Sequence, residues 1–341
     1  MASFMLSAIV QKVTGEKVID YLTPRLFKPL GIKGVDWETN PQGINTGGWG
    51  LRIKSEDMAK LGQLYLQKGK WDGKKILTEE WVEEATSLKI QQNPDMTQAK
   101  RDSSNDGAQG YCYQFWRARH NSYMANGAFG QFILVMPEKD AVVVLTAESP
   151  DMWGELDMVW KYLYPGIHDN ALPADEKSSA ELKQRLASLA LPIPAKSANE
   201  VMSRKVSGKT FYFTENQKKI QSLSLQFNDD QCLLNLKTDS VSSDISFGPG
   251  RWQFGETARH GPSIFERALG SLEGLPPFKI TAAFTWLDDQ TLELTLRYIE
   301  NVHSERIIFH FDDIDKNKIL VDFKVSNAPG NRFTRIEGSV Q

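Results

Sequence analysis

Residues 123–132 have the sequence Tyr123-Met124-Ala125-Asn126-Gly127-Ala128-Phe129-Gly130-Gln131-Phe132, and two short apolar runs separated by Pro137–Asp140 follow as far as Thr146. Gly127 and Gly130 stand inside a strand-like pattern, where glycine lowers stability unless backbone has to come close to something. A β-bulge or a tight packing point between strands would also explain both glycines. The residues alone therefore predict a hairpin whose glycines serve either packing or contact with a ligand.

Strand-like patterns continue on both sides of this hairpin. Residues 111–116 alternate between two faces, and further strands are expected over residues 122–126, 131–136 and 141–147. The run Val142–Leu145 is apolar on both faces, which predicts a central strand of the sheet that is covered on both sides.

Helical patterns flank the strands. Helices are expected over residues 2–14, 16–22, 56–68 and 151–163, with Ser55 and Thr78 as N-caps and residues 90–108 as a long mobile loop. The apolar positions expected to be buried in the first helix are Phe4, Met5, Ala8, Ile9 and Val13, and those in the last are Met152, Leu156, Val159, Trp160 and Leu163. Helices packed on a sheet in this order indicate an α+β layered domain over residues 1–164.

A linker and a second domain follow. Residues 165–200 are rich in proline and polar residues, with a short charged helix near residues 175–189. From residue 201 to residue 341 the pattern is almost wholly β, as in Leu292, Leu294 and Leu296, which alternate with polar residues. Many short strands joined by Asp- and Asn-containing turns predict an all-β barrel or sandwich domain.

The composition excludes several classes of protein. The net charge is -3 and basic residues form no long run, which argues against nucleic acid as a partner. No apolar stretch is long enough to cross a bilayer, and no secretory signal is recognisable. Cys112 and Cys232 fall in different predicted domains, so two buried free thiols are expected, although a disulfide stays open.

Complete catalytic sets are missing from the sequence. It contains no G-x-S-x-G, H-E-x-x-H, P-loop or C-x-x-C motif, and its five histidines are scattered. No two histidines stand at metal-ligand spacing, so neither a metal site nor a cofactor is expected.

A set of ordered segments nevertheless points to one family. In chain order these segments are Lys12–Gly15, Leu26–Ile32, Gly47–Leu51, Ser55–Gly62 and Gly127–Gln131. In this order, over residues 2 to about 163, the chain resembles the serine β-lactamase and penicillin-binding-protein superfamily, in particular its class C β-lactamase, D-alanyl-D-alanine carboxypeptidase and esterase branch. The resemblance implies a β-lactamase/transpeptidase-like domain that lacks its N-terminal portion.

The resemblance also implies acyl transfer through a serine ester. Family members attack an amide or ester carbonyl with the serine of S-x-x-K, and the lysine and a Y-x-N tyrosine handle the proton. A third motif lies on a strand that edges the site, and Ala125-Asn126-Gly127 matches it in position. By this match Asn126 would be a polar contact, Gly127 would let the substrate backbone pass, and the Ala128 amide would be an oxyanion-hole donor.

The departures from the family pattern are as informative as the matches. Ala125 replaces the usual Lys or His, which removes a contact to a substrate carboxylate and favours an ester or amide other than a β-lactam or D-alanyl-D-alanine peptide. Neither S-x-x-K nor Y-x-N occurs in the chain. The nucleophile and base are therefore expected upstream of Met1, and the chain by itself is expected to be inactive.

Two hypotheses account for the missing motifs. In the first, Met1 is an internal methionine of a longer secreted hydrolase, periplasmic or on the cell surface, which acts on a peptidoglycan-like or other small substrate. In the second, the chain is a non-catalytic binding module that works through its β domain. A truncated first domain would also expose apolar surface, so self-association is expected.

The second domain carries no recognisable chemistry. Its aromatic residues are expected to form a core rather than a ligand-lined barrel mouth: Trp252, Phe254, Phe284, Trp286, Phe309 and Phe311. A lid, a cell-wall-binding module and a dimerisation element remain open as roles for this domain.

Overall fold

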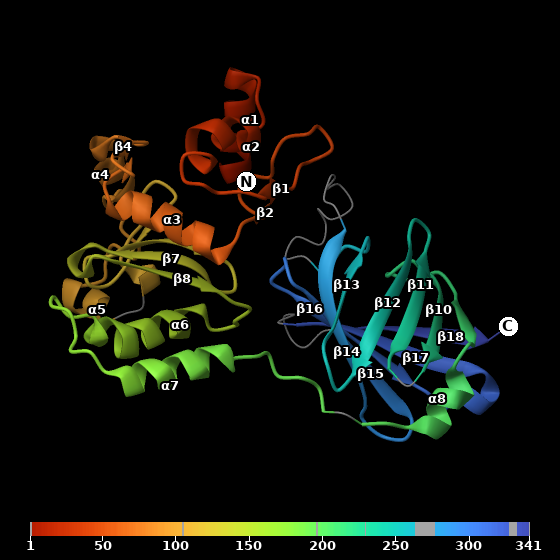
Figure 1. Cartoon of the computed structure of the whole chain (residues 1–341). Coiled ribbons are helices and arrows are strands. Elements are labelled where there is room, and N and C mark those ends of the chain that lie inside the picture. The colour runs from red at the N-terminus through yellow and green to blue at the C-terminus, as the bar shows by residue number, and fades with distance from the viewer. Residues whose placement is uncertain are drawn as a thin grey trace. The chain divides into compact units, whose positions relative to one another are not determined.

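The computed structural model describes residues 2–103, 106–195, 197–228, 230–262, 277–326 and 333–340. The described residues form two compact units, which divide between Asp175 and Glu176 (Figure 1). The first unit mixes helices with a small sheet and the second is a β-barrel, which confirms the expected α+β class with a barrel rather than a sandwich.

The first unit opens with two helices and a short ribbon. Helix α1 (Ala2–Thr14) ends at Gly15, whose φ of 76° suits glycine, and α2 (Val18–Leu22) continues through Pro24 as the π-helical turn η1 (Thr23–Phe27). Strands β1 (Asp36–Trp37) and β2 (Leu51–Arg52) pair antiparallel. These elements are tied together by Asn45, which is fully buried.

The Asn45 contacts reach three elements. Its Oδ1 accepts from the Ile19 amide of α2, its Nδ2 donates to the Trp37 carbonyl of β1, and its backbone carbonyl accepts from the Ser7 hydroxyl of α1 at 2.7 Å. Because each of these groups would otherwise be a polar group removed from water, Asn45 holds the N-terminal layer together.

Helix α1 differs from its expected role as a core helix. Only Ser7 is buried, whereas Met5, Ile9 and Val13 are 55%, 53% and 78% exposed. The apolar periodicity predicted the helix correctly, but no element of the described ranges covers this stripe. The assignment of the stripe to the core is therefore wrong.

The central sheet of the first unit has the order β5 (Trp116–Arg117), β6 (Tyr123–Gly127), β7 (Gln131–Met136) and β8 (Ala141–Thr146), all antiparallel. Helix α3 (Ser55–Leu66) packs on one face, against β7 and β8, and α6 (Met152–Met158) packs on the other (Figure 1). Gly62 permits the close approach of α3, because a Cβ there would lie 2.5 Å from Val142 Cγ1.

Strand β8 is an edge strand and not the central strand that its pattern predicted. Val142 faces α3, and Val143 and Leu145 pack in the cluster on the α6 face, so both faces are covered as expected. An apolar pattern reports which faces are covered and says nothing about hydrogen bonding along the edge.

The ends of two helices correct further details. Thr78 caps α4 (Glu79–Thr86) by accepting from the Trp81 amide, as predicted, but Ser55 is the first residue of α3 and caps nothing. Helix α6 widens into the π-helical turn η4 (Val159–Leu163), which changes the angular spacing of the side chains. Leu163 is consequently 49% exposed, although Leu156, Val159 and Trp160 are buried as predicted.

The described residues between 90 and 108 contain regular elements that the sequence did not predict. They contain α5 (Gln98–Asp102) and the 3₁₀ turn η2 (Asp106–Ala108), which are organised by the buried Arg101. The Arg101 guanidinium donates to the carbonyls of Gln92, Asn93, Met96 and Ala108. A long loop can therefore be fixed from within by one side chain that satisfies four backbone oxygens.

The strand expected over residues 111–116 is mostly absent, because Gln114 takes a φ of 62° and only β5 remains extended. The other short elements of this unit are β3 (Lys70–Trp71), β4 (Lys74–Lys75), η3 (Pro137–Lys139) and η5 (Tyr164–Gly166).

The second unit begins with α7 (Glu176–Ala187), the charged helix that the sequence predicts, and α8 (Glu200–Val206). The strands are β9 (Thr210–Phe213), β10 (Ile220–Phe227), β11 (Cys232–Thr238), β12 (Ser242–Pro249), β13 (Gln253–Thr257), β14 (Phe278–Trp286), β15 (Thr291–Tyr298), β16 (Ser304–His310), β17 (Lys318–Val325) and β18 (Phe333–Val340), with η6 (Ile314–Lys316) before β17. The ring closes where Gly248 and Pro249 of β12 pair with Ala283 and Phe284 of β14.

Inward-facing side chains of the barrel form one cluster. Phe284, Trp286, Phe309 and Phe311 belong to it, as expected, and Met202 and Val206 of α8 add to it. Phe254 is 71% exposed, so its assignment to the core is wrong. Cys112 and Cys232 are buried free thiols. Within the described ranges, no helix is both long and apolar enough to span a membrane.

Candidate functional site

The four residues that the sequence singled out lie in succession at one end of β6. Ala125, Asn126 and Gly127 are the last residues of the strand, and Ala128 begins the turn to β7, in which Phe129 and Gly130 both have positive φ values. Gly127 pairs with Gln131 across the hairpin. The structure thus brings the predicted site residues together, and their role as substrate contacts stays a prediction.

Neighbouring segments hold the turn in place. The Gln131 carboxamide donates to the carbonyls of Ala128 and Ala147, and the Ser149 amide donates to the Phe129 carbonyl at 3.0 Å. Phe129 has a φ of 64°, an unfavourable conformation for a residue with a side chain, so these contacts have to fix the turn against local strain.

Glu155 of α6 lies directly beneath the turn. A Cβ on Gly130 would stand 2.2 Å from the Glu155 carboxylate, so glycine is required there on both steric and conformational grounds. Burial raises the pKa of the Glu155 carboxyl, the Ser149 hydrogen bond lowers it and Asp151 raises it further, with a net upward shift. This acid was missed by the sequence reasoning because it is distant in sequence from the hairpin.

One edge of β6 is open beside these residues. Strand β5 reaches only as far as Met124, and the Ala118 amide donates to the Ser122 carbonyl across that edge. In an antiparallel strand the N–H and C=O groups of every second residue point to the same edge. The N–H groups of Asn126 and Ala128 therefore point to the edge at which the Ser122 carbonyl meets Ala118. Within the part of the chain that the structure describes, no strand pairs with this edge beyond Met124.

The backbone amide of Ala128 is the group at this edge that could take part in a reaction. Ala128 is exposed, and its N–H donates no hydrogen bond to any described residue. A fixed backbone N–H at a strand edge can donate a hydrogen bond to a substrate oxygen that becomes negative during a reaction. Ala125 contributes no charge beside it.

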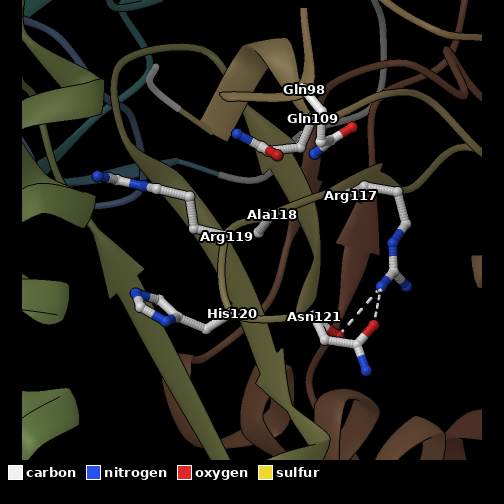
Figure 2. A pocket seen from close by; sticks show the side chains of 7 residues that line it. All are labelled: Gln98, Gln109, Arg117, Ala118, Arg119, His120 and Asn121. Atoms are coloured by element: carbon white, nitrogen blue, oxygen red, sulfur yellow. Dashed lines mark hydrogen bonds between the residues drawn. The ribbon is translucent and has the colours of Figure 1, made fainter. Parts of the chain in front are cut away.

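A hollow of about 430 Å³ lies at the other end of β6, around the turn that leads into it from β5 (Figure 2). It is lined by Gln98, Gln109 and residues 117–121. The sequence reasoning did not identify this hollow, although three basic or titratable residues within four positions, Arg117, Arg119 and His120, were a visible signal.

A buried ionic cluster supports the hollow. Asp106 is fully buried and accepts hydrogen bonds from the backbone and guanidinium of Arg119 and from the Trp160 indole, the last at 2.9 Å. Arg119 also pairs with Asp157. The His120 ring stacks on Tyr164, with a centroid distance of 4.3 Å. Among the described residues, no group of three His, Cys, Asp or Glu side chains is placed to hold a metal ion.

Comparison with known proteins adds the following. Residues 1–158 match the family model for β-lactamase. No curated protein matches the sequence. Similar solved structures include a Bacillus anthracis protein described as a 6-aminohexanoate-dimer hydrolase, with 21% identity, 48% of this chain and 41% of that chain covered, and a TM-score of 0.37.

Two further similar structures cover other parts of the chain. An octameric penicillin-binding protein homologue from Pyrococcus abyssi is 15% identical, with 97% of this chain and 62% of that chain covered and a TM-score of 0.35. A fatty-acid-binding protein from Drosophila melanogaster is 13% identical, with 40% of this chain and 99% of that chain covered and a TM-score of 0.27. The chain thus spans less than two thirds of the two hydrolase-like structures.

Proposed function

We propose that this chain provides the substrate-binding strand edge of a serine acyl-transfer site, since residues 1–158 match the family model for β-lactamase. In this proposal Asn126 and Gly127 lie along an amide or ester substrate, and the Ala128 N–H donates to the carbonyl oxygen that becomes negative in the tetrahedral state. The observation that carries the proposal is the unpaired Ala128 amide at the open edge of β6.

In this proposal the nucleophile comes from outside residues 1–341, because S-x-x-K and Y-x-N are absent from them. We propose that the chain by itself binds substrate weakly and does not turn it over, because one oxyanion donor without a nucleophile supplies only part of the transition-state stabilisation. The compartment that goes with this function, by analogy with the family, is periplasmic or the cell surface.

The substrate class follows from Ala125. A lysine or histidine at this position would attract a carboxylate, and alanine has neither charge nor a donor. The proposed substrate is therefore a neutral amide or ester, or a peptide whose carboxyl terminus is blocked. Nothing in the immediate strand edge favours an anionic substrate over its neutral analogue.

The test uses backbone NMR of the ¹⁵N-labelled full chain. N-acetyl-D-alanyl-D-alanine amide, which is neutral, is expected to shift the Ala128 and Asn126 amide signals, and the corresponding free acid is expected to shift them less. A fluorophosphonate probe is expected to leave the intact mass of the chain unchanged. Equal shifts for both peptides would overturn the substrate class, and a covalent adduct would overturn the lack of turnover.

The alternative function, a binding module centred on the β domain, has less support. Its aromatic rings pack on one another, as in the stacked pair Phe309 and Phe311 and the tilted pair Trp286 and Phe311. Rings that fill a core with each other are not presented to a ligand. We therefore propose the acyl-transfer edge as the working part of the chain.

A further inference from the structure

Arg117 carries a positive charge that no described side chain neutralises. Its Nη1 donates to the Thr86 carbonyl at 3.2 Å, and its Nη2 donates to the carbonyl and the Oδ1 of Asn121 at 3.1 and 2.7 Å. All three acceptors are neutral, and Arg117 forms no ion pair with any residue in the described ranges. The guanidinium is thus fixed in position while its charge stays uncompensated.

The neighbouring arginine shows the contrast. Arg119, two residues later, pairs with the buried Asp106 and with Asp157, so its charge is neutralised on the side away from Arg117 (Figure 2). Asp106 is fully buried and does not reach the surface of the hollow. Among the described residues that line the hollow there is no carboxylate, and Arg117 is the arginine of the lining that has no ion pair with a described residue.

The rest of the lining offers hydrogen bonds without charge. The carboxamides of Gln98 and Gln109 lie across the hollow from the turn formed by His120 and Asn121 (Figure 2). Gln109 Nε2 donates to the Arg101 carbonyl at 2.8 Å, which orients its carboxamide, and a carboxamide has two donor hydrogens and an acceptor oxygen, so it can bond a hydroxyl group as well. A volume of about 430 Å³ is within the range of small-molecule sites.

The turn itself is held in an unusual conformation. His120 and Asn121 have φ values of 53° and 50°, and neither is glycine. Such turns persist only where surrounding contacts over-determine them, here the Tyr164 stack and the Arg117 hydrogen bonds. The walls of the hollow are therefore preformed, which reduces the ordering cost of binding.

We propose that this hollow binds a small hydroxylated carboxylate, with its carboxylate on Arg117 and its hydroxyl groups on Gln98 and Gln109. The site is independent of the proposed acyl-transfer edge, because the two lie at opposite ends of β6, on the order of 15 Å apart along the strand. Arg117 also has a structural role, because its three hydrogen bonds connect the end of α4 to the turn at Asn121. These bonds use three of its five N–H groups and leave two for a ligand.

The test titrates the ¹⁵N-labelled full chain with gluconate, with glucitol as the uncharged analogue and inorganic phosphate as an anion without a carboxylate. Gluconate is expected to shift the backbone amides of Arg117 and Asn121, two residues that line the hollow. Binding should weaken as salt is added, because the pair is partly exposed. Glucitol should produce no comparable shift.

The variant Arg117→Gln is expected to weaken gluconate binding by about tenfold or more, as loss of a charge-assisted pair does. Arg117→Lys keeps the charge and should retain part of the affinity, which separates loss of binding from loss of fold. The control is Arg25→Gln, which removes an exposed arginine paired with Glu16 and should bind gluconate as the unmodified chain does.

Three outcomes would overturn the proposal. These are equal shifts with gluconate and glucitol, unchanged binding by a folded Arg117→Gln variant, and binding of phosphate in preference to gluconate. The first would indicate a site for polyols, the second a site that does not involve Arg117, and the third an inorganic anion site.

Discussion

Glu305 of β16 is 1% exposed and directs its carboxylate into the barrel, where it forms an ion pair with the Arg259 guanidinium. Arg259 Nη2 donates to Glu305 Oε1 at 2.9 Å, and Nη1 donates to the Tyr298 hydroxyl at 3.0 Å. Burial raises the pKa of Tyr298 to about 12, so its hydroxyl stays protonated. Such a pair stabilises the fold only as long as both charges are present.

Replacement of Glu305 by glutamine is therefore expected to destabilise the barrel by about 3–5 kcal/mol, because it leaves Arg259, whose side chain is only 17% exposed, without this counter-charge. The exposed pair of Lys318 and Glu337 supplies the control, since Glu337→Gln should cost about 1 kcal/mol or less. Urea unfolding of the full chain, followed by hydrogen exchange of barrel amides, measures both. Equal effects of the two substitutions would contradict the assigned role of the buried pair.

The same pair sets a dependence on pH. Burial would raise the pKa of Glu305, but Arg259 outweighs it, so the folded-state pKa lies below the ordinary value of 4.5. A depressed carboxyl pKa contributes stability that is present above the ordinary value and is lost as the pH falls through the folded-state value. Barrel amides should lose exchange protection in that acidic range, and the loss should be smaller in Glu305→Gln.

At the scale of elements, the packing of α3 on the sheet depends on Gly62. A Cβ at this position would stand 2.5 Å from Val142 and 2.8 Å from Ile133, on neighbouring strands. Helix and sheet can approach this closely only where one side chain is missing. Glycine inside a helix otherwise lowers stability by about 1 kcal/mol, so its presence reflects the packing.

We expect Gly62→Val to destabilise the first unit by about 1–3 kcal/mol, through overpacking that pushes α3 away from β7 and β8. The neighbouring substitution Gln63→Val introduces the same side chain without facing that contact, and should change stability by about 0.5 kcal/mol or less. Chemical unfolding followed by amide exchange of β7 gives both values. A stabilising effect of Gly62→Val would show that the contact is looser than the geometry indicates.

Edge strand β8 shows what periodicity does and does not report. Its valines face α3 and α6 on alternate sides, which an apolar run predicts correctly. Its place in the sheet depends on which other strand pairs with it, and that is a relation between segments distant in sequence. The widening of α6 into a π-helical turn, which exposes Leu163, is likewise not encoded in apolar spacing.

At the scale of the molecule, the apolar stripe of α1 remains uncovered. Met5, Leu6, Ile9 and Val13 are all more than half exposed, at 55%, 51%, 53% and 78%. Adjacent exposed apolar side chains on one helix face form a patch of the kind that mediates association. We propose that this stripe drives self-association of the chain.

The double variant Ile9→Lys with Val13→Glu is expected to shift the chain toward the monomer, because the charges make burial of the stripe unfavourable. Light scattering coupled to size-exclusion chromatography at several concentrations measures the shift. Phe254→Lys, which removes an isolated exposed aromatic residue of the barrel, should leave the distribution unchanged. A monomer at every concentration of the unmodified chain would refute the proposal.

Local sequence determined the hairpin of β6 and β7, the helix that ends at Gly15, the Thr78 cap and the all-β character of the second unit. Each depends on the conformational preference of a few neighbouring residues or on a short apolar period, so each is visible in the chain itself. The ordered segments from Lys12 to Gln131 resembled one family, and residues 1–158 match the family model for β-lactamase.

Tertiary structure alone decided which surfaces are covered and which groups meet. The Glu155 carboxyl beneath Gly130 and the hydrogen bond from Arg117 to the Thr86 carbonyl each join segments far apart in sequence. Side-chain periodicity records the tendency of a residue to be buried, but burial requires a partner surface. Whether such a partner exists is settled only when the whole chain has folded.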